Sequence, residues 1–227
     1  AYHSRYQYRV ELTDVENGFE WKNNLSETGA KAVWTRVLDP GFQVQWGLQS
    51  SLYHFAPIDL TPAPESALQQ IQTSPKNGLL QSLFVGTTWD ISTKLSTEAG
   101  LRWGIYQQFG PGTEYLYPER IPDREASSVD SVGFGSLEAM QFYQGLEPRV
   151  AFRFLVNEQT SIKAALNRNF QYLQIASNSS AGLPIDRWIM ADRYVRPVRS
   201  DQISLGLFRN FNANKWEFSL ETYYKDL

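Results

Sequence analysis

The chain has 227 residues, a formal net charge of −3 and no cysteine. The near-balanced charge provides no basic surface for nucleic acid, and the lack of cysteine excludes a disulfide framework and thiolate chemistry. No segment approaches the roughly 18 consecutive apolar residues of a membrane helix, although a membrane-spanning strand needs only one apolar face.

The first two predicted strands cover residues 2–12 and 28–38, and a tight turn at 39–41 leads into a third strand, 42–55. Apolar and polar residues alternate along all three, least cleanly in the second, as a strand with a side-chain period of two requires. The turn carries proline and glycine in positions that are typical of tight turns. These three segments predict antiparallel strands.

The clearest alternation lies in a predicted hairpin that joins residues 79–90 to residues 93–109. The second of these strands has one apolar wall and one wall that carries Glu98 and Arg102. Its length exceeds the roughly 9–11 residues with which a tilted strand crosses a bilayer. This hairpin therefore favours a transmembrane barrel over an ordinary sheet, whose strands average about 5–6 residues.

Four further strands are predicted at 146–155, 161–174, 200–211 and 216–224. The apolar face of the strand 161–174 is expected to carry Ile162, Ala164, Leu166, Phe170 and Tyr172. One cation, Arg168, falls on the same face. Arginine costs roughly 2–4 kcal/mol near the bilayer midplane and about 0–1 kcal/mol at the interface. We expect Arg168 either to reach the lipid headgroups or to be turned inward by a bulge.

The connections between these nine strands alternate between long and short. The long connections are predicted at 13–26, 56–78, 110–145 and 175–199. The short turns are predicted at 39–41, 91–93, 156–159 and 212–214. Bacterial outer-membrane barrels have this asymmetry, with long extracellular loops and short periplasmic turns, whereas a soluble sandwich has no reason to sort its loops by end.

The two faces of the strands predict which side chains meet lipid and which meet the barrel lumen. We expect the lumen-facing residues to include Glu98, Arg102, Glu147, Arg149, Arg153 and Glu217. We expect the lipid-facing or aromatic-girdle residues to include Trp46, Trp89, Trp103, Phe152, Trp216 and Phe218. The lumen-facing set mixes both signs, for example Glu98 with Arg102, which suits a wet interior packed against another segment.

The sequence offers little for catalysis or metal binding. His3 and His54 are the only histidines, and His54 lies between Tyr53 and Phe55 at a strand end, where a girdle position is expected. Acidic residues of the longest connection could be considered as a calcium site, but they lack the spacing of a calcium loop: Asp123, Glu125 and Asp130. We therefore expect no catalytic residue, no cofactor and no metal site.

Several segments resemble TonB-dependent outer-membrane receptors of the Bacteroidetes type. The similar runs are Thr28–Ala32 with Gln43–Pro57, Ser82–Trp89 with Lys94–Trp103, Leu146–Arg149 with Ser161–Ala164, and Gln202–Gly206 with Glu221–Leu227. The match covers most of the chain and keeps its order. One departure is Gly86-Thr87-Thr88, where the family has Gln-Asp-Glu.

The resemblance implies that residues 1–227 are part of one β-barrel domain, with about nine strands of an all-β, antiparallel barrel of roughly 22 strands. It also implies that the plug domain and TonB box of the family are absent from this stretch. The expected location is the bacterial outer membrane, and the expected partners are the remaining barrel and plug, the TonB complex, a surface lipoprotein, and lipid or lipopolysaccharide, with no nucleic acid.

The expected function is import of a large or scarce nutrient such as a glycan, a peptide or a metal chelate, without enzymatic activity. Two alternatives remain open from the sequence. One is a structural or docking barrel in another outer-membrane complex. The other is a soluble β-sandwich that binds carbohydrate through its aromatic residues, which make up 14% of the chain.

Overall fold

The computed structural model describes residues 1–14, 17–72, 74–118, 128–177, 186–211, 213 and 215–227. All regular elements in these ranges are strands, and every paired strand is antiparallel. Among these residues no helix is long and apolar enough to cross a membrane. The predicted all-β, antiparallel fold class is confirmed.

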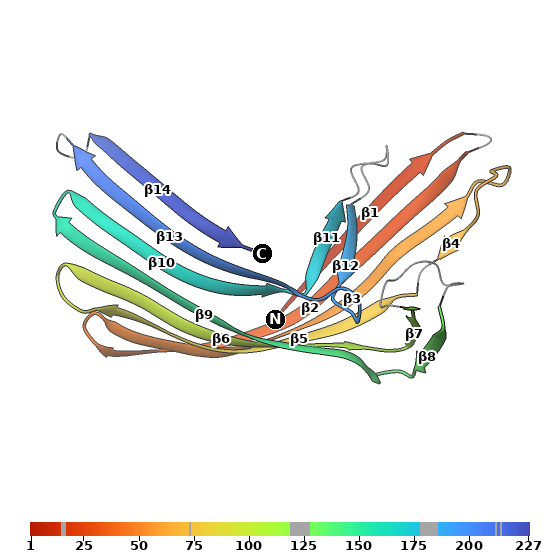
Figure 1. Ribbon diagram of the computed structural model, residues 1–227, viewed down its shortest axis with the longest axis horizontal. Coiled ribbons are helices and arrows are strands. Elements are labelled where there is room, and N and C mark those ends of the chain that lie inside the picture. Colours follow the sequence, from red (N-terminus) through yellow and green to blue (C-terminus); the bar gives the residue numbers. More distant parts are fainter. Residues whose placement is uncertain (15–16, 73, 119–127, 178–185, 212, 214) are drawn as a thin grey trace.

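One large sheet contains the nine predicted strands in chain order, and Figure 1 shows that it curves into an open wall. Its strands are β1 (Tyr2–Leu12), β2 (Phe19–Asp39), β3 (Phe42–Pro62), β5 (Lys76–Asp90), β6 (Leu95–Phe109), β9 (Ala139–Asn157), β10 (Thr160–Gln171), β13 (Val198–Phe211) and β14 (Trp216–Asp226). Each strand pairs with the next member of this series, so the wall is a meander of hairpins.

Several strands run further into the predicted loops than the alternation indicated. Both β2 and β3 have 21 residues, so much of the predicted loops 13–26 and 56–78 is strand. Likewise, β9 begins at Ala139, within the predicted loop 110–145. The reason lies in the pairing: all of β1 pairs with the first half of β2, Phe19–Gly29, so polar residues there continue the ladder.

The short turns predicted at 39–41, 91–93 and 156–159 occur where they were predicted, whereas residues 212 and 214 of the fourth predicted turn lie outside the described residues. Gly41 has φ of 84°, which a glycine adopts without steric cost, and its carbonyl accepts a 2.7 Å hydrogen bond from the Asp90 N–H. At the next turn, Ser92 Oγ accepts the N–H groups of Lys94 and Leu95. These three turns lie at one end of the wall, as do the end of β13 and the start of β14 (Figure 1).

The other end of the wall carries small elements within the long connections. These are β4 (Ile71–Gln72), which pairs with β3, and two separate hairpins, β7 (Gly112–Leu116) with β8 (Asp130–Phe134) and β11 (Leu173–Ser177) with β12 (Asp186–Met190). Figure 1 shows the β11–β12 hairpin inside the concavity of the wall. We call this the loop-side end, and the opposite end the turn-side end.

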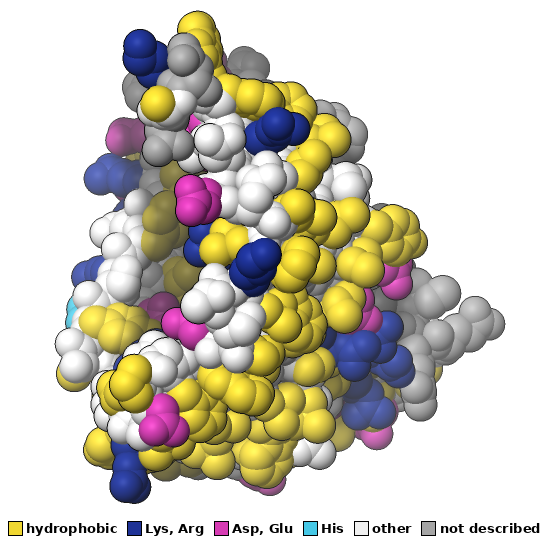
Figure 2. Space-filling view, turned by 90° about the vertical axis from the view of Figure 1, so that its left-hand side faces the viewer, with side chains coloured by type: hydrophobic (Ala, Val, Ile, Leu, Met, Phe, Trp, Pro, Cys, Tyr) yellow, Lys and Arg dark blue, Asp and Glu magenta, His cyan; other side chains and the backbone are white. Residues whose placement is uncertain are grey.

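The curved sheet has a convex apolar face and a concave polar face. The register aligns large apolar side chains across four strands of the convex face in the row Leu48, Leu83, Trp103 and Leu146. These side chains are between 40% and 55% exposed, because no second sheet covers them. Figure 2, which views the turn-side end, shows hydrophobic side chains as a broad surface from top to bottom. A single-layer wall of this kind is not a soluble sandwich, whose apolar faces cover each other.

Candidate functional site

The concave face carries a charged contact between two neighbouring strands. Arg102 of β6 lies opposite Glu147 of β9, with Nε 3.5 Å from Oε2, and its Nη2 donates a 2.8 Å hydrogen bond to Ser82 Oγ on β5. The sequence interpretation linked Arg102 with Glu98 on its own strand. Cross-strand partners are only about 4.5–5.5 Å apart, whereas residues four apart on one strand are separated by about 13 Å, so Arg102 pairs across the ladder instead.

A second cation, Arg149, lies across a recess that two glycines leave open. A Cβ placed on Gly100 would be 2.8 Å from Arg149 Nε, and one on Gly86 would be 3.7 Å from its Nη2. The departure of this chain from the family motif at Gly86 therefore gives room to the guanidinium group. Among the described residues Arg149 has no carboxylate within 4 Å, and it lines a polar pocket with Glu98 and Asn167.

All six residues that were expected to face the lumen share the concave face. Arg153 pairs in the ladder with Lys163, and Glu217 pairs with Asn210, both on this same face. No counter-charge among the described residues lies within ion-pair distance of Arg153 or Glu217. The structure therefore brings Arg102 and Glu147 together, places Glu98 and Arg149 in one pocket, and leaves Arg153 and Glu217 toward the turn-side end.

The six aromatic residues that were expected to face lipid or form a girdle share the convex face. Their exposed fractions run from 40% for Trp103 to 69% for Trp216. Trp89 and Phe42 contact each other at the turn-side end, with ring centroids 5.7 Å apart. The remaining members of the set are Trp46, Phe152 and Phe218.

An aromatic layer covers the concave face near the loop-side end. Tyr106 of β6 stacks on Tyr172, with ring centroids 5.1 Å apart and an interplanar angle of 16°, and Phe55, Met190 and Ala191 complete the buried cluster. Burial raises the pKa of Tyr172 to about 12. Its hydroxyl has no hydrogen-bond partner in the described part of the chain. This cluster is the main buried apolar region of the wall.

The prediction that Phe170 and Tyr172 lie on the apolar face with Leu166 was wrong. Pairing of β10 with β9 ends at Asn167, and the Phe170 N–H instead donates a 2.8 Å hydrogen bond to Glu147 Oε1 on the concave side. The β10 strand thus leaves β9 and folds over the concave face. Gly145 and Gly104 make this possible, since a Cβ there would lie 2.5 Å from the Phe170 ring and 3.3 Å from the Tyr172 hydroxyl.

A strap formed by residues 190–196 follows the β11–β12 hairpin and is fixed to the wall. Lys76 of β5 forms a 2.9 Å ion pair with Asp192, and the Tyr143 hydroxyl of β9 donates a 2.8 Å hydrogen bond to the Asp192 carbonyl. The other carboxylate oxygen of Asp192 accepts the N–H groups of Tyr194 and Val195, each at 2.9 Å. One aspartate thus shapes the strap and attaches it to two strands.

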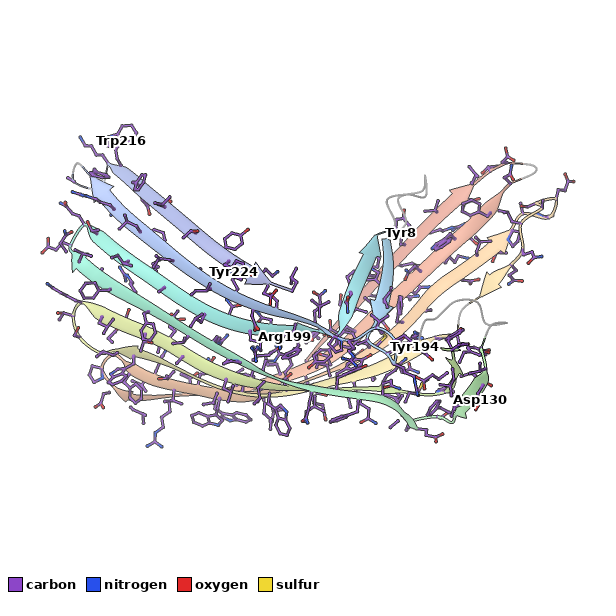
Figure 3. The ribbon with its side chains drawn as sticks, in the orientation of Figure 1. Tyr8, Asp130, Tyr194, Arg199, Trp216 and Tyr224 are labelled. Atoms are coloured by element: carbon purple, nitrogen blue, oxygen red, sulfur yellow. The ribbon has the colours of Figure 1, made fainter. Side chains whose placement is uncertain are left out.

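The strap also holds the β7–β8 hairpin. The Tyr194 hydroxyl donates to the Tyr115 carbonyl at 2.8 Å and accepts the Tyr117 N–H at 3.3 Å, and Figure 3 shows Tyr194 beside this hairpin. Arg193 Nη1 lies 3.3 Å from a carboxylate oxygen of Glu114. Sequence reasoning treated residues 175–199 as a long connection and missed this strap. Its only local signal is the apolar pair Met190-Ala191 directly before Asp192.

The described residues contain no arrangement that suggests catalysis or metal binding. His3 Nδ1 pairs with Thr28 Oγ1 and His54 Nδ1 with Asn77 Oδ1, each at 2.8 Å across a strand pair. Of the acidic residues considered for calcium, Asp123 and Glu125 lie outside the described residues, and Asp130 begins β8. No group of three or more possible metal ligands occurs in the ranges that the structure describes.

The fold and its two faces define a class: a wall of an outer-membrane β-barrel with short turns at one end. The family model of the TonB dependent receptor-like β-barrel matches residues 1–227, so the chain belongs to this family. Members of the family are proteins of the bacterial outer membrane, and the same location holds for this chain. No curated protein matches the sequence.

Three solved structures have a similar fold. They are the alcaligin outer-membrane receptor FauA from Bordetella pertussis (14% identity, TM-score 0.55), the ferric preacinetobactin receptor BauA from Acinetobacter baumannii (11%, 0.54), and the hemophore receptor HasR from Serratia marcescens, a double mutant in complex with HasA and heme (16%, 0.51). The match covers 97%, 97% and 98% of this chain but only 32%, 33% and 38% of those chains. The chain therefore spans about a third of the structures that it resembles, and these structures are receptors.

Proposed function

We propose that residues 1–227 are part of one β-barrel domain of a TonB-dependent receptor of the Bacteroidetes type, which imports a large or scarce nutrient through the outer membrane. The observation that carries this proposal is the match of the receptor-barrel family model over the whole chain. Transport rather than catalysis is supported by the three similar structures, all of which are receptors.

We assign the concave face to the barrel lumen and the convex face to lipid. In water both faces of a sheet can be polar, but in hydrocarbon a side chain that faces lipid must be apolar. The concave face carries Glu98, Arg149 and Arg153 without a counter-charge in the described residues, so another segment is needed to neutralise them. The plug domain of the family would supply it, while the TonB complex supplies energy and a surface lipoprotein closes the loop-side end.

The concave loop-side end is the expected point of substrate entry. The strap of residues 190–196 already occupies part of it, so a substrate would contact the strap before it reached the lumen. The similar structures are named for alcaligin, ferric preacinetobactin and a heme-carrying hemophore. For this chain we propose a substrate from one of three classes: a glycan, a peptide or a metal chelate.

The direct test is nutrient-limited growth of the source bacterium. Deletion of the parent gene should abolish growth on one glycan, peptide or metal chelate as the only source, and deletion of TonB should abolish growth on the same compound. Complementation with the intact gene should restore growth, whereas complementation without the strap residues tests the entry route. Normal growth of both deletion strains on every nutrient in a broad panel would contradict the import function.

The single-barrel assignment has its own test. β1 and β14 each pair along only one edge in the described residues, so both free edges would expose unpaired backbone groups, each of which costs several kcal/mol in hydrocarbon. Residues 1–227 expressed alone should therefore aggregate or associate edge to edge after refolding in detergent. Gel mobility before and after boiling measures this, and a monomeric heat-modifiable band would show that the wall closes unaided.

A further inference from the structure

A charged cluster interrupts the convex face at the loop-side end of β10 and β13. Arg168 and Asp201 form the next pair on this face after Leu166 and Ile203, two residues further along the register. Arg168 donates from Nε to Oδ1 at 2.5 Å and from Nη2 to Oδ2 at 2.9 Å, and Arg199 Nε lies 3.3 Å from Oδ2. This bidentate contact fixes one guanidinium plane, and the carboxylate holds the second guanidinium beside it.

The strand length gives the height of this cluster relative to the apolar band. Between Ile203 and Phe211 the convex face of β13 is apolar apart from Arg209, which lies close to the turn. Eight steps of about 3.4 Å make about 27 Å along the strand, or about 21 Å along the membrane normal at a tilt of about 40°. An outer-membrane barrel has an apolar band about 25 Å tall, so the pair Arg168 and Asp201 lies at its upper edge.

Aromatic residues mark the same two boundaries on the neighbouring strand. Trp216 begins β14 at the turn-side end, and Tyr224 pairs with Ile203 just below the charged cluster. Figure 3 labels Trp216 and Tyr224 toward opposite ends of this strand, and Arg199 near the loop-side end of β13. Tyrosine and tryptophan gather at the two membrane–water interfaces. The cluster therefore lies at the level of the headgroups of the outer leaflet.

We propose that Arg168 and Arg199 form a binding site for a phosphate group of a lipid in the outer leaflet, of the kind that lipid A carries. Nη1 of Arg168 and both Nη atoms of Arg199 have no carboxylate partner among the described residues, and guanidinium groups recognise phosphate through paired hydrogen bonds. Asp201 positions the two guanidinium groups. Another charged residue of this face, Asp226, pairs with Asp201 from β14, on the side of Asp201 opposite to Arg168.

The site can be tested in the parent receptor, purified in detergent with all its domains. Native mass spectrometry would compare binding of lipid A with binding of dephosphorylated lipid A. The R168A/R199A variant should lose about tenfold or more in affinity for lipid A, since a charge-assisted hydrogen bond contributes roughly 1.5–3 kcal/mol. Arg209→Ala is the matched control, because Arg209 lies on the same strand and face but near the turns, and this variant should bind as the wild type does.

Each outcome decides for or against the site. Equal binding of dephosphorylated lipid A, or wild-type affinity of the folded R168A/R199A variant, would overturn it. Displacement of lipid A by millimolar inorganic phosphate would show a site for free anions rather than for lipid. If the R168A/R199A variant does not give a heat-modifiable band, and so does not fold, R168K/R199K replaces it. Lysine keeps the charge but cannot bind a phosphate in a bidentate manner, so the affinity of this variant for lipid A should fall. An unchanged affinity would count against the proposal. None of these readouts depends on transport.

Discussion

The convex and concave faces of this wall come from the same strands, yet they follow different rules. On the convex face the positions below the charged cluster are mostly apolar and exposed, and neighbours there interact through side-chain packing in rows such as Leu83 and Trp103. On the concave face, charges, glycines and aromatic rings alternate, and contacts reach over long sequence distances, such as Lys76 with Asp192. The convex face therefore meets one uniform environment, whereas the concave face meets a set of specific side-chain partners.

The largest loss of stability is expected when a charge is placed on the convex face, and the same charge on the concave face serves as the control. Leu205 lies on the convex face in the middle of β13, and its chain neighbour Ser204 lies on the concave face. Leu205→Arg in the parent receptor should lower the free energy of unfolding in lipid vesicles by roughly 2–4 kcal/mol, because the guanidinium would be near the bilayer midplane. Denaturant titration followed by tryptophan fluorescence measures it. Ser204→Arg is the control and should cost far less; equal costs would contradict the assignment of the two faces.

The second expected effect tests the glycine contacts of the concave face. A Cβ at Gly145 would lie 2.5 Å from the Phe170 ring, so Gly145→Ala should displace the aromatic layer and cost roughly 1–3 kcal/mol of stability. The same denaturant titration applies. Gly133→Ala is the matched control, because nothing lies within 4 Å of a Cβ there. A loss of stability no larger than that of Gly133→Ala would show that the Phe170 ring does not pack against β9 at Gly145.

A smaller effect is expected at the strap. Lys76→Ala removes the ion pair with Asp192, whose side chains are 32% and 20% exposed, so the loss should be about 1 kcal/mol or less. Amide hydrogen exchange should become faster at Ala191, which donates to the Tyr172 carbonyl, and unchanged elsewhere. Lys163→Ala, which removes a cation over the Phe208 ring, is a control that should leave exchange in the strap unaltered.

The smallest perturbation is a pair of spin labels on adjacent residues of β6. Leu101 lies on the convex face and Arg102 on the concave face, so nitroxides there should report opposite accessibility to oxygen and to a polar relaxing agent. Neither label should prevent folding, since each replaces an exposed or partly exposed side chain. Similar accessibility at both positions would mean that the convex face does not meet lipid.

The sequence predicted the wall well because a period of two is a local signal. Leu101 and Arg102 lie on opposite faces of the wall, as a period of two requires, and the turn at Gly41 was recognisable from its residues alone. Each of these features depends on neighbours in the chain. A family resemblance then added the order of the hairpins.

The features that the sequence did not predict depend on contacts between distant residues. The alternation around Phe170 continues the pattern of Leu166, so nothing local shows that β10 leaves β9 at Asn167. The cause is tertiary: Glu147 accepts the Phe170 N–H, and a glycine on β9 makes room for the ring. The extension of β2 to Phe19 was missed for a similar reason, because polar residues that pair in a ladder look like a loop.

The length of the first hairpins has a mechanical consequence for the cell surface. With 21 residues each, β2 and β3 run for about 70 Å, or about 55 Å along the membrane normal at a tilt near 40°, which is about twice the height of the apolar band. The paired strands β2 and β3 therefore extend above the lipid at the loop-side end as a stiff, hydrogen-bonded hairpin. The loop-side end of this hairpin, rather than the lipid surface, is what an approaching antibody or phage tail first meets, and an epitope tag inserted at Asn17 would be displayed above the lipid.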